Sequence, residues 1–404
     1  MKNKLLSMII LIFILALTGC GKAGSFDQAG KKSFANGKYD KAAESFMAAI
    51  KENPNRADYY IDYGMALIAL GKYEDALLQF DRAYIDKDML IIRENNKRAL
   101  RGKGIAYFQM KEYTKAIEEL KQALQIEELS NLNKDITYYM ADALSATGAY
   151  GKAIKAYSSV IALDKRAVIA YSKRAICYKS LGEYEKSLAD YDNVIKLEPK
   201  NYNAYLGKYY LLTEMKDDTG MLKVLEDAEA IVPKTNEDKY NLAKIHYFQG
   251  EYDAALTELN DGYSNGILEA YYYLGETYRI QKDYEKAIYY YKNYIDSGAI
   301  MTSNVYNQIA ICLMKVDQSK DALQYVKTGI AYNNAATLQI LQRNEIILYE
   351  KTGNYEEAKQ ELDQYIKTYP KDTQAAREAE FVNTRVEVIP EQRLSQNRGY
   401  TELR

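Results

Sequence analysis

The stretch GKYDKAAESF (residues 37–46) decides the fold, because variants of it return along the chain. Eight clear copies share an aligned tyrosine: Tyr39, Tyr73, Tyr113, Tyr150, Tyr184, Tyr252, Tyr284 and Tyr355. Two of the intervals are 34 residues long, and the two longest intervals are close to twice that period. Degenerate copies at residues 205–233 and 306–330 fill those long intervals, which brings the number of copies to ten. A fixed period of this length indicates a repeat protein.

Each copy has the pattern of two helices joined by a Gly-Lys/Glu-Tyr turn. Large residues recur three and four positions apart on both sides of that turn, which is helical rather than strand spacing. Glycine ends the first helix because it tolerates a positive φ. Small residues such as Gly64, Gly104 and Gly275 let the two helices of a copy approach closely. One helix pair cannot bury its apolar stripe alone, so the sequence predicts an all-α fold in which neighbouring copies stack.

This pattern resembles the tetratricopeptide repeat, a helix-turn-helix unit of 34 residues. In the fifth copy the signature positions of that family are occupied by Tyr171, Ala175, Tyr178, Gly182, Tyr184, Tyr191 and Pro199. The resemblance covers about residues 23–371 and implies an α-α superhelix, a solenoid of about ten repeats. In this family, repeat positions two, five, nine and twelve line a concave groove.

The first twenty residues resemble the signal peptide of a bacterial lipoprotein. Lys2 and Lys4 precede an apolar run at residues 5–17, as in a secretory signal. The run is shorter than the roughly 20 apolar residues of a membrane-spanning helix, which disfavours an uncleaved anchor or a buried helix. The ending LTGC resembles a lipobox, and this implies that a diacylglyceryl group, with acyl chains such as palmitate, alkylates the thiol of Cys20 and that the chain is cleaved before this residue. We therefore expect a protein anchored by lipid to the extracytoplasmic face of a bacterial cell membrane.

These patterns predict four segments along the chain. They are a signal peptide at 1–19, a short lipid-anchored linker at 20–25, the repeat array at 26–371, and a C-terminal part at 372–404. Within the last segment, residues 373–385 have the pattern of a polar-faced capping helix. From residue 386 the tail has little pattern, and we expect it to be mobile.

Composition disfavours several functions. Lys and Arg number 54 against 56 Asp and Glu, so the net charge of −2 gives no electrostatic basis for binding nucleic acid. Cys177 and Cys312 fall at one small repeat position, where we expect buried free thiols. His246, the only histidine, falls at a bulky position, and we interpret it as a packing residue because no nucleophile motif accompanies it. We expect no enzyme activity, no cofactor and no metal site.

The groove positions supply candidate binding residues, because spacings of three, four and three place them on one helical stripe. The candidates are Arg98, Arg101, Tyr210, Tyr240, Lys244, Tyr247, Tyr272 and Arg279. We expect the last six, on copies six to eight, to face solvent and form the main site. The basic cluster of Arg93, Lys97, Arg98, Arg101 and Lys103 is interpreted as a solvated face rather than an anion site.

The leading functional hypothesis is a non-enzymatic scaffold or assembly adaptor that binds a protein or peptide in the cell envelope. Tyrosine and arginine are frequent hot-spot residues of such interfaces. The paired Lys and Asn of the family's carboxylate clamp are not reproduced, which disfavours binding of chaperone C-termini. Two alternatives stay open: the tyrosine-rich groove binds a glycan or cell-wall polymer, or the groove is merely wetted and partners bind elsewhere. The sequence leaves the partner, the membrane type and the oligomeric state open.

Overall fold

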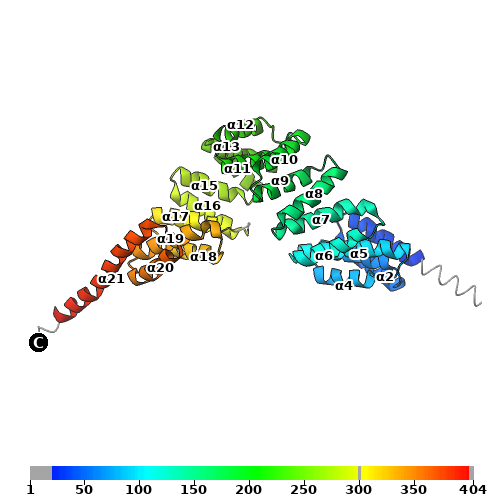
Figure 1. The fold of residues 1–404 in the computed structure, drawn as a ribbon, viewed down its shortest axis with the longest axis horizontal. Coiled ribbons are helices and arrows are strands. Elements are labelled where there is room, and N and C mark those ends of the chain that lie inside the picture. The colour runs from blue at the N-terminus through cyan, green and yellow to red at the C-terminus, as the bar shows by residue number, and fades with distance from the viewer. Residues whose placement is uncertain (1–20, 299–301, 400–404) are drawn as a thin grey trace, which may run out of the picture. The chain divides into compact units, whose positions relative to one another are not determined.

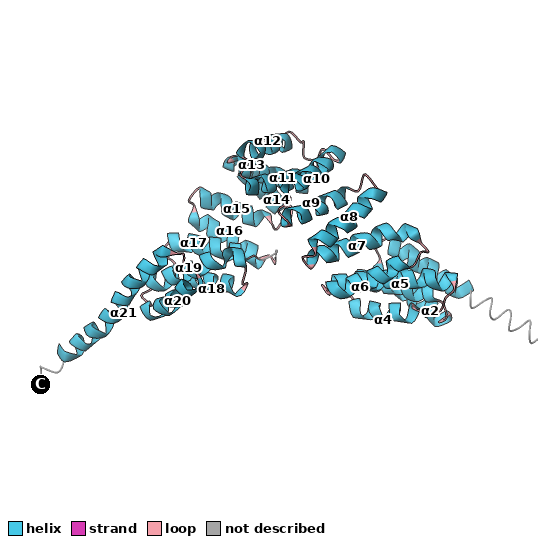
Figure 2. Cartoon of the chain, viewed as in Figure 1, coloured by secondary structure: helices cyan, strands magenta, loops and turns pink. Residues whose placement is uncertain are grey.

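The computed structural model describes residues 21–298 and 302–399, and all regular secondary structure in these ranges is helical (Figures 1 and 2). A first helix covers residues 21–35. The others are α2 Tyr39–Glu52, α3 Ala57–Ala69, α4 Tyr73–Ala83, α5 Leu90–Gln109, α6 Tyr113–Gln125, η1 Ser130–Leu132, α7 Asn133–Ala146, α8 Tyr150–Leu163, α9 Val168–Ser180, α10 Tyr184–Leu197, α11 Tyr202–Met215, α12 Asp218–Glu229, α13 Asn236–Gln249, α14 Tyr252–Ser264, α15 Ala270–Ile280, α16 Tyr284–Asp296, α17 Ser303–Lys315, α18 Ser319–Ala331, α19 Ala335–Lys351, α20 Tyr355–Thr368 and α21 Thr373–Gly399. The prediction of an all-α repeat fold is confirmed.

The chain divides into two compact units, with the boundary between Asp218 and Thr219. In the first unit, copies two to five form the helix pairs α3–α4, α5–α6, α7–α8 and α9–α10. In the second unit, copies seven to ten form α13–α14, α15–α16, α17–α18 and α19–α20. Within each unit, the second helix of a pair packs on the first helix of the next pair. The boundary falls inside copy six, whose helix α11 belongs to the first unit.

The turns and close approaches within the pairs follow from small residues. Gly182 ends its helix with a φ of 72°, and Lys111 adopts 62° at the corresponding turn of copy three, which lacks the glycine. A Cβ added to Gly64 would lie 2.7 Å from the Phe80 ring, and one added to Gly275 would lie 2.7 Å from the Tyr291 ring. The prediction that these glycines permit close helix packing is confirmed, because no larger side chain fits without displacing a buried ring.

Both ends of the described chain differ from the predicted segments. Residues 21–25 belong to the first helix instead of a linker, and Ala23 is fully buried beside Ala49 and Tyr59. The apolar contact of Ala23 ties this part of the helix to the first repeats. At the other end α21 continues to Gly399, well past the residue where the sequence pattern fades. Its buried Val382 packs in one cluster with Leu362 and Tyr365 of α20.

The structure does not describe the predicted membrane anchor, but it does describe the two cysteines of the repeats. The predicted signal peptide and Cys20 lie outside the described residues. Within the ranges 21–298 and 302–399, no helix is both long enough and apolar enough to span a bilayer. Cys177 and Cys312 are free and fully buried, so the prediction for these two thiols is confirmed. Burial raises the pKa of Cys177, which makes its thiol a poor nucleophile.

The prediction of a solvated basic face on α5 is wrong for Lys97, and the other cations of the cluster are partly exposed and form ion pairs. Arg93 bonds to Glu128 at 2.7 Å, and Lys103 pairs with Glu119 at 2.9 Å. Lys97 is fully buried, and its Nζ donates to the carbonyl oxygens of Ile126 at 2.7 Å and of Glu128 at 2.6 Å. The lysine therefore holds the loop after α6 against α5 rather than facing water.

Candidate binding groove

A pocket of about 270 Å³ opens in the first unit between the helix of residues 21–35, α3 and α5. Its apolar wall consists of Phe34, Ala35, Phe46, Ile61, Met65 and Leu132. Its polar lining consists of Lys31, Asp62, Arg98 and Arg101. A mostly apolar cavity with a few convergent polar groups is the usual form of a binding pocket.

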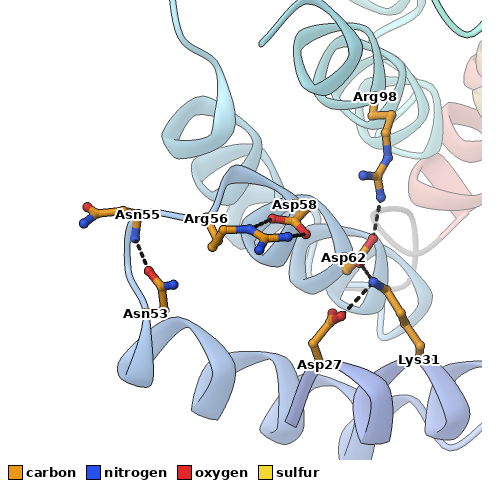
Figure 3. A network of polar contacts seen from close by, with 8 residues as sticks. All are labelled: Asp27, Lys31, Asn53, Asn55, Arg56, Asp58, Asp62 and Arg98. Atoms are coloured by element: carbon orange, nitrogen blue, oxygen red, sulfur yellow. Dashed lines mark hydrogen bonds and ion pairs between the residues drawn. The ribbon is translucent and has the colours of Figure 1, made fainter. Parts of the chain in front are cut away.

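Asp62 lines this pocket and joins Arg98 and Lys31 in one network of polar contacts (Figure 3). Its Oδ1 accepts a hydrogen bond from Nη2 of Arg98 at 2.8 Å, and its Oδ2 lies 3.3 Å from Nζ of Lys31. Lys31 also bonds to Asp27 at 2.8 Å, so three successive copies meet in one network. Burial raises the pKa of Asp62, against the opposing charges of Arg98 and Lys31. The carboxylate is therefore poorly hydrated and depends on its two cations.

Ion pairs between neighbouring copies, like that of Arg98 and Asp62, continue along the groove of the next copies. Nε of Arg101 donates to Oδ2 of Asp135 at 2.5 Å. Farther along, Lys173 pairs with Asp142, a residue of α7 whose Oδ1 also accepts the Tyr157 hydroxyl at 2.5 Å. Tyr157 is a core residue of α8 with 1% of its surface exposed. Asp142 is therefore held by a core tyrosine of its own repeat and by a lysine of the next repeat.

In the second unit the predicted aromatic groove is largely filled by its own side chains. Tyr240 is only 6% exposed, so the expectation that it faces solvent is wrong. Its ring packs edge-on against Tyr273, with centroids 6.1 Å apart, and Tyr247 packs against the same ring at 5.4 Å. Tyr272 packs against Tyr294 at 5.8 Å. Neighbouring repeats carry tyrosines at facing positions, and these rings cover one another.

Glu276 is the polar centre of that cluster and is itself buried. It accepts hydrogen bonds from the Tyr291 hydroxyl at 2.5 Å, from Nη2 of Arg279 at 2.8 Å and from the Tyr247 hydroxyl at 3.5 Å. Burial raises the pKa of Tyr247, and the charge of Glu276 acts in the same direction. The arrangement repeats that of Asp142 and Tyr157: a core tyrosine of the second helix donates to the acid on the groove side of the first.

The structure also shows the surroundings of Lys244 and Tyr210, two further residues of the predicted main site. Nζ of Lys244 lies 4.5 Å from the centroid of the Tyr240 ring, a cation–π contact, and burial lowers the pKa of this lysine. Tyr210 is 39% exposed and belongs to the first unit, whereas the five other residues of the predicted main site belong to the second. Whether any of these residues binds a ligand stays a prediction.

Of the predicted residues, only Arg98 and Arg101 line the pocket of the first unit. Sequence reasoning missed the rest of the lining, including Lys31, Phe34, Asp62 and Met65. Lys31, Phe34 and Met65 occupy groove positions of the first two copies, so the repeat register could have found them. Asp62 lies next to a groove position, and nothing in the sequence pattern marked it as a binding residue.

Comparisons with known proteins agree with this architecture. Tetratricopeptide repeat models match residues 28–89, 99–128, 168–201, 240–299 and 346–372. The Hsp70-Hsp90 organizing protein of Triticum aestivum is 26% identical over 218 residues, which are 47% of this chain and 38% of that protein. A TPR repeat-containing protein of Methanocaldococcus jannaschii is 24% identical over 352 residues, 82% of this chain and 56% of that protein. The chain thus spans less than half the length of the Triticum aestivum relative and a little more than half the length of the Methanocaldococcus jannaschii relative.

A tetratricopeptide repeat protein of known structure from Parabacteroides merdae is 20% identical, with a TM-score of 0.45 over 61% of this chain and 94% of that one. The family models cover more than half of this chain, and most of the matched residues lie on the helices described above. The chain belongs to the tetratricopeptide repeat family.

Proposed function

We propose that this chain is a non-enzymatic scaffold that binds a protein or peptide, and that the pocket of the first unit receives an apolar side chain of that partner. The observation that carries the proposal is the composition of the pocket, with an apolar wall beside a rim of paired charges. An apolar residue entering the pocket displaces water from Phe34 and Met65, which is a favourable exchange. The similarity to a protein named Hsp70-Hsp90 organizing protein, from Triticum aestivum, supports a protein partner.

The rim supplies the polar part of recognition. A guanidinium group has five N–H donors, and the bonds of Arg98 to Asp62 and of Arg101 to Asp135 use only part of them. The remaining donors are available to carbonyl oxygens of a bound backbone. Because Arg98 and Arg101 keep 33% and 23% of their side-chain surface exposed, they can reach a ligand without breaking these ion pairs.

We place this scaffold on the extracytoplasmic face of a bacterial membrane, held by lipid on Cys20. The support is the lipobox-like ending of the N-terminal apolar run. Residue 21, which directly follows that cysteine, already belongs to a helix, and Ala23 of this helix is buried against α2 and α3. An anchor at residue 20 therefore tethers the first unit to the membrane surface through very little chain.

The glycan alternative has weaker support. A sugar stacks on an open aromatic face, but the ring of Tyr240 is buried, and those of Tyr247 and Tyr272 pack against neighbouring tyrosines. The pocket of the first unit is lined by phenylalanine and aliphatic side chains beside charged groups. This lining suits a peptide better than a polysaccharide.

A crosslinking capture from membranes tests the pocket. Met65→Lys places a charged side chain in the apolar wall, and we expect recovery of the partner to fall at least tenfold, or about 1.4 kcal/mol. Met47→Lys is the matched control, because Met47 is 52% exposed on α2 and does not line the pocket. Circular dichroism should show equal helicity for both variants. Unchanged recovery with Met65→Lys, or recovery of polysaccharide alone from the wild type, contradicts the proposal.

A separate measurement tests the anchor. We expect Cys20→Ala to abolish labelling by a palmitate analogue and to move the protein out of the membrane fraction or leave an uncleaved precursor. Cys177→Ala is the control, because that buried thiol lies inside the repeat array and should leave labelling unchanged. Mass spectrometry that finds an unmodified mature N-terminus in native membranes rules out lipidation, and it leaves the pocket proposal standing.

A further inference from the structure

Three helix ends of the second unit bring together one imidazole and two carboxylates. Glu229 is the last residue of α12, His246 lies in the last turn of α13, and Glu251 is the N-cap of α14. One ligand atom from each side chain lies within 4.8 Å of the other two. His246 is the only histidine of the chain, so no other part of the sequence can supply an imidazole.

The histidine is oriented by a fourth residue. Its Nδ1 lies 2.8 Å from Oε2 of Glu258, which lies on α14 about two turns after Glu251. An imidazole whose Nδ1–H donates to a carboxylate presents its other nitrogen, Nε2, as an acceptor. Metal-binding histidines are typically held in this way, since the outer carboxylate fixes the tautomer and raises the basicity of the ligating nitrogen.

Glu229 is positioned as well. Nε2 of Gln249 donates to its Oε2 at 2.9 Å. Oε1 of the same Gln249 amide is buried and has no hydrogen-bond donor within the described ranges. A buried carbonyl oxygen without a donor is costly, and an ordered water or an ion is the usual partner of such an atom. This orphan oxygen belongs to the residue that holds one of the three candidate ligands.

The charge around the cluster also favours a cation. Over the part of the chain that the structure describes, none of Glu229, Glu251 and Glu258 pairs with a lysine or an arginine, whereas the groove acids Asp62, Asp142 and Glu276 each do. The carboxyl ends of α12 and α13 add the negative ends of two helix dipoles, against one positive end from the amino terminus of α14. A protonated His246 alone would leave most of this negative charge uncompensated.

We propose that Glu229, His246 and Glu251 bind a divalent first-row transition metal ion of the zinc type, through Nε2 of the histidine and one oxygen of each carboxylate. Imidazole favours zinc over magnesium or calcium, which prefer oxygen ligands alone. Three donors at about 2.1 Å from one ion lie roughly 3.4 Å apart, so small rotations of the exposed Glu229 and Glu251 side chains close the site. The ion joins three helix ends, and water or a donor from another molecule completes its coordination.

The single histidine makes the site directly observable in tag-free protein labelled with 15N-histidine. On titration with Zn²⁺ we expect one equivalent to bind and Nε2 of the one imidazole to shift, while Nδ1 stays protonated toward Glu258. Titration calorimetry should show that His246→Gln and the double variant Glu229→Gln/Glu251→Gln each weaken Zn²⁺ binding at least tenfold. Ca²⁺ and Mg²⁺ should bind at least tenfold more weakly than Zn²⁺.

The controls separate this site from general attraction to acidic surface. Glu226→Gln removes an exposed carboxylate of α12 outside the cluster and should change the affinity less than twofold. Because Glu229 and Glu251 are exposed, the double variant should keep the helicity of the wild type even if His246→Gln is less stable. An imidazole spectrum unchanged at saturating Zn²⁺, or equal affinity in the double variant and in Glu226→Gln, overturns the proposal and leaves His246 as a partner of Glu258 only.

Discussion

Lys97→Ala is expected to lower the free energy of unfolding around α5 and α6 by about 3–5 kcal/mol. Lys97 is fully buried, and its ammonium group donates to two carbonyl oxygens of the loop after α6. The alanine leaves a cavity where the aliphatic stem lay and two buried acceptors without their donor. Burial lowers the pKa of Lys97, so the fold retains this charge at a cost, and the carbonyl bonds offset that cost.

Hydrogen exchange of peptides from α5 and α6 is the suitable measurement, because different repeats of one array can open separately. Lys121→Ala, an exposed lysine of α6, is the matched control and should change the local stability by no more than about 0.5 kcal/mol. Lys97→Met distinguishes the two contributions, since it keeps most of the stem and removes only the donor. If Lys97→Ala behaves like Lys121→Ala, water replaces the ammonium group at the carbonyls.

Tyr240→Ala is expected to destabilise the second unit by a similar amount, about 3–5 kcal/mol, as other buried aromatic truncations do. The residue packs in one cluster with Ala243, Leu259 and Leu274, and its ring also lies under the Lys244 ammonium group. Removing the ring therefore opens a cavity between α13 and the next repeat. This expectation replaces the sequence-based one, in which Tyr240 faces solvent and takes no part in the core.

The matched control is Tyr289→Ala, because Tyr289 is 59% exposed on α16. Local stability at α13 to α15, again from hydrogen exchange, should fall only with Tyr240→Ala. A loss of partner binding in that variant then reports unfolding rather than a lost contact, which is why the pocket of the first unit is the better place to test function. Unchanged protection at α13 together with reduced partner recovery would instead show that Tyr240 faces a ligand.

The candidate sites were less predictable than the fold, and for identifiable reasons. Arg98 and Arg101 were found because they occupy groove positions and carry charge, but the apolar wall they border was not. Groove aromatics were expected to be free because no signature position requires them. The rings of Tyr247 and Tyr273 instead contact each other from consecutive repeats, a contact that neither repeat encodes alone. The cluster of Glu229, His246 and Glu251 has no ligand motif along the chain, since three different helix ends supply it.

The sequence by itself determined the repeat period, the all-α fold, the turn glycines and the close approach at Gly64 and Gly275, because these depend on local backbone conformation and on contacts within one copy. Only the tertiary structure decided which groove residues are exposed. Tyr210 and Tyr240 both occupy groove positions, yet the first is 39% and the second 6% exposed. Lys97 is buried by a loop that belongs to an irregular interval between copies. Burial depends on what the neighbouring repeat or loop places opposite a side chain, and a periodic pattern within one helix carries no information about that.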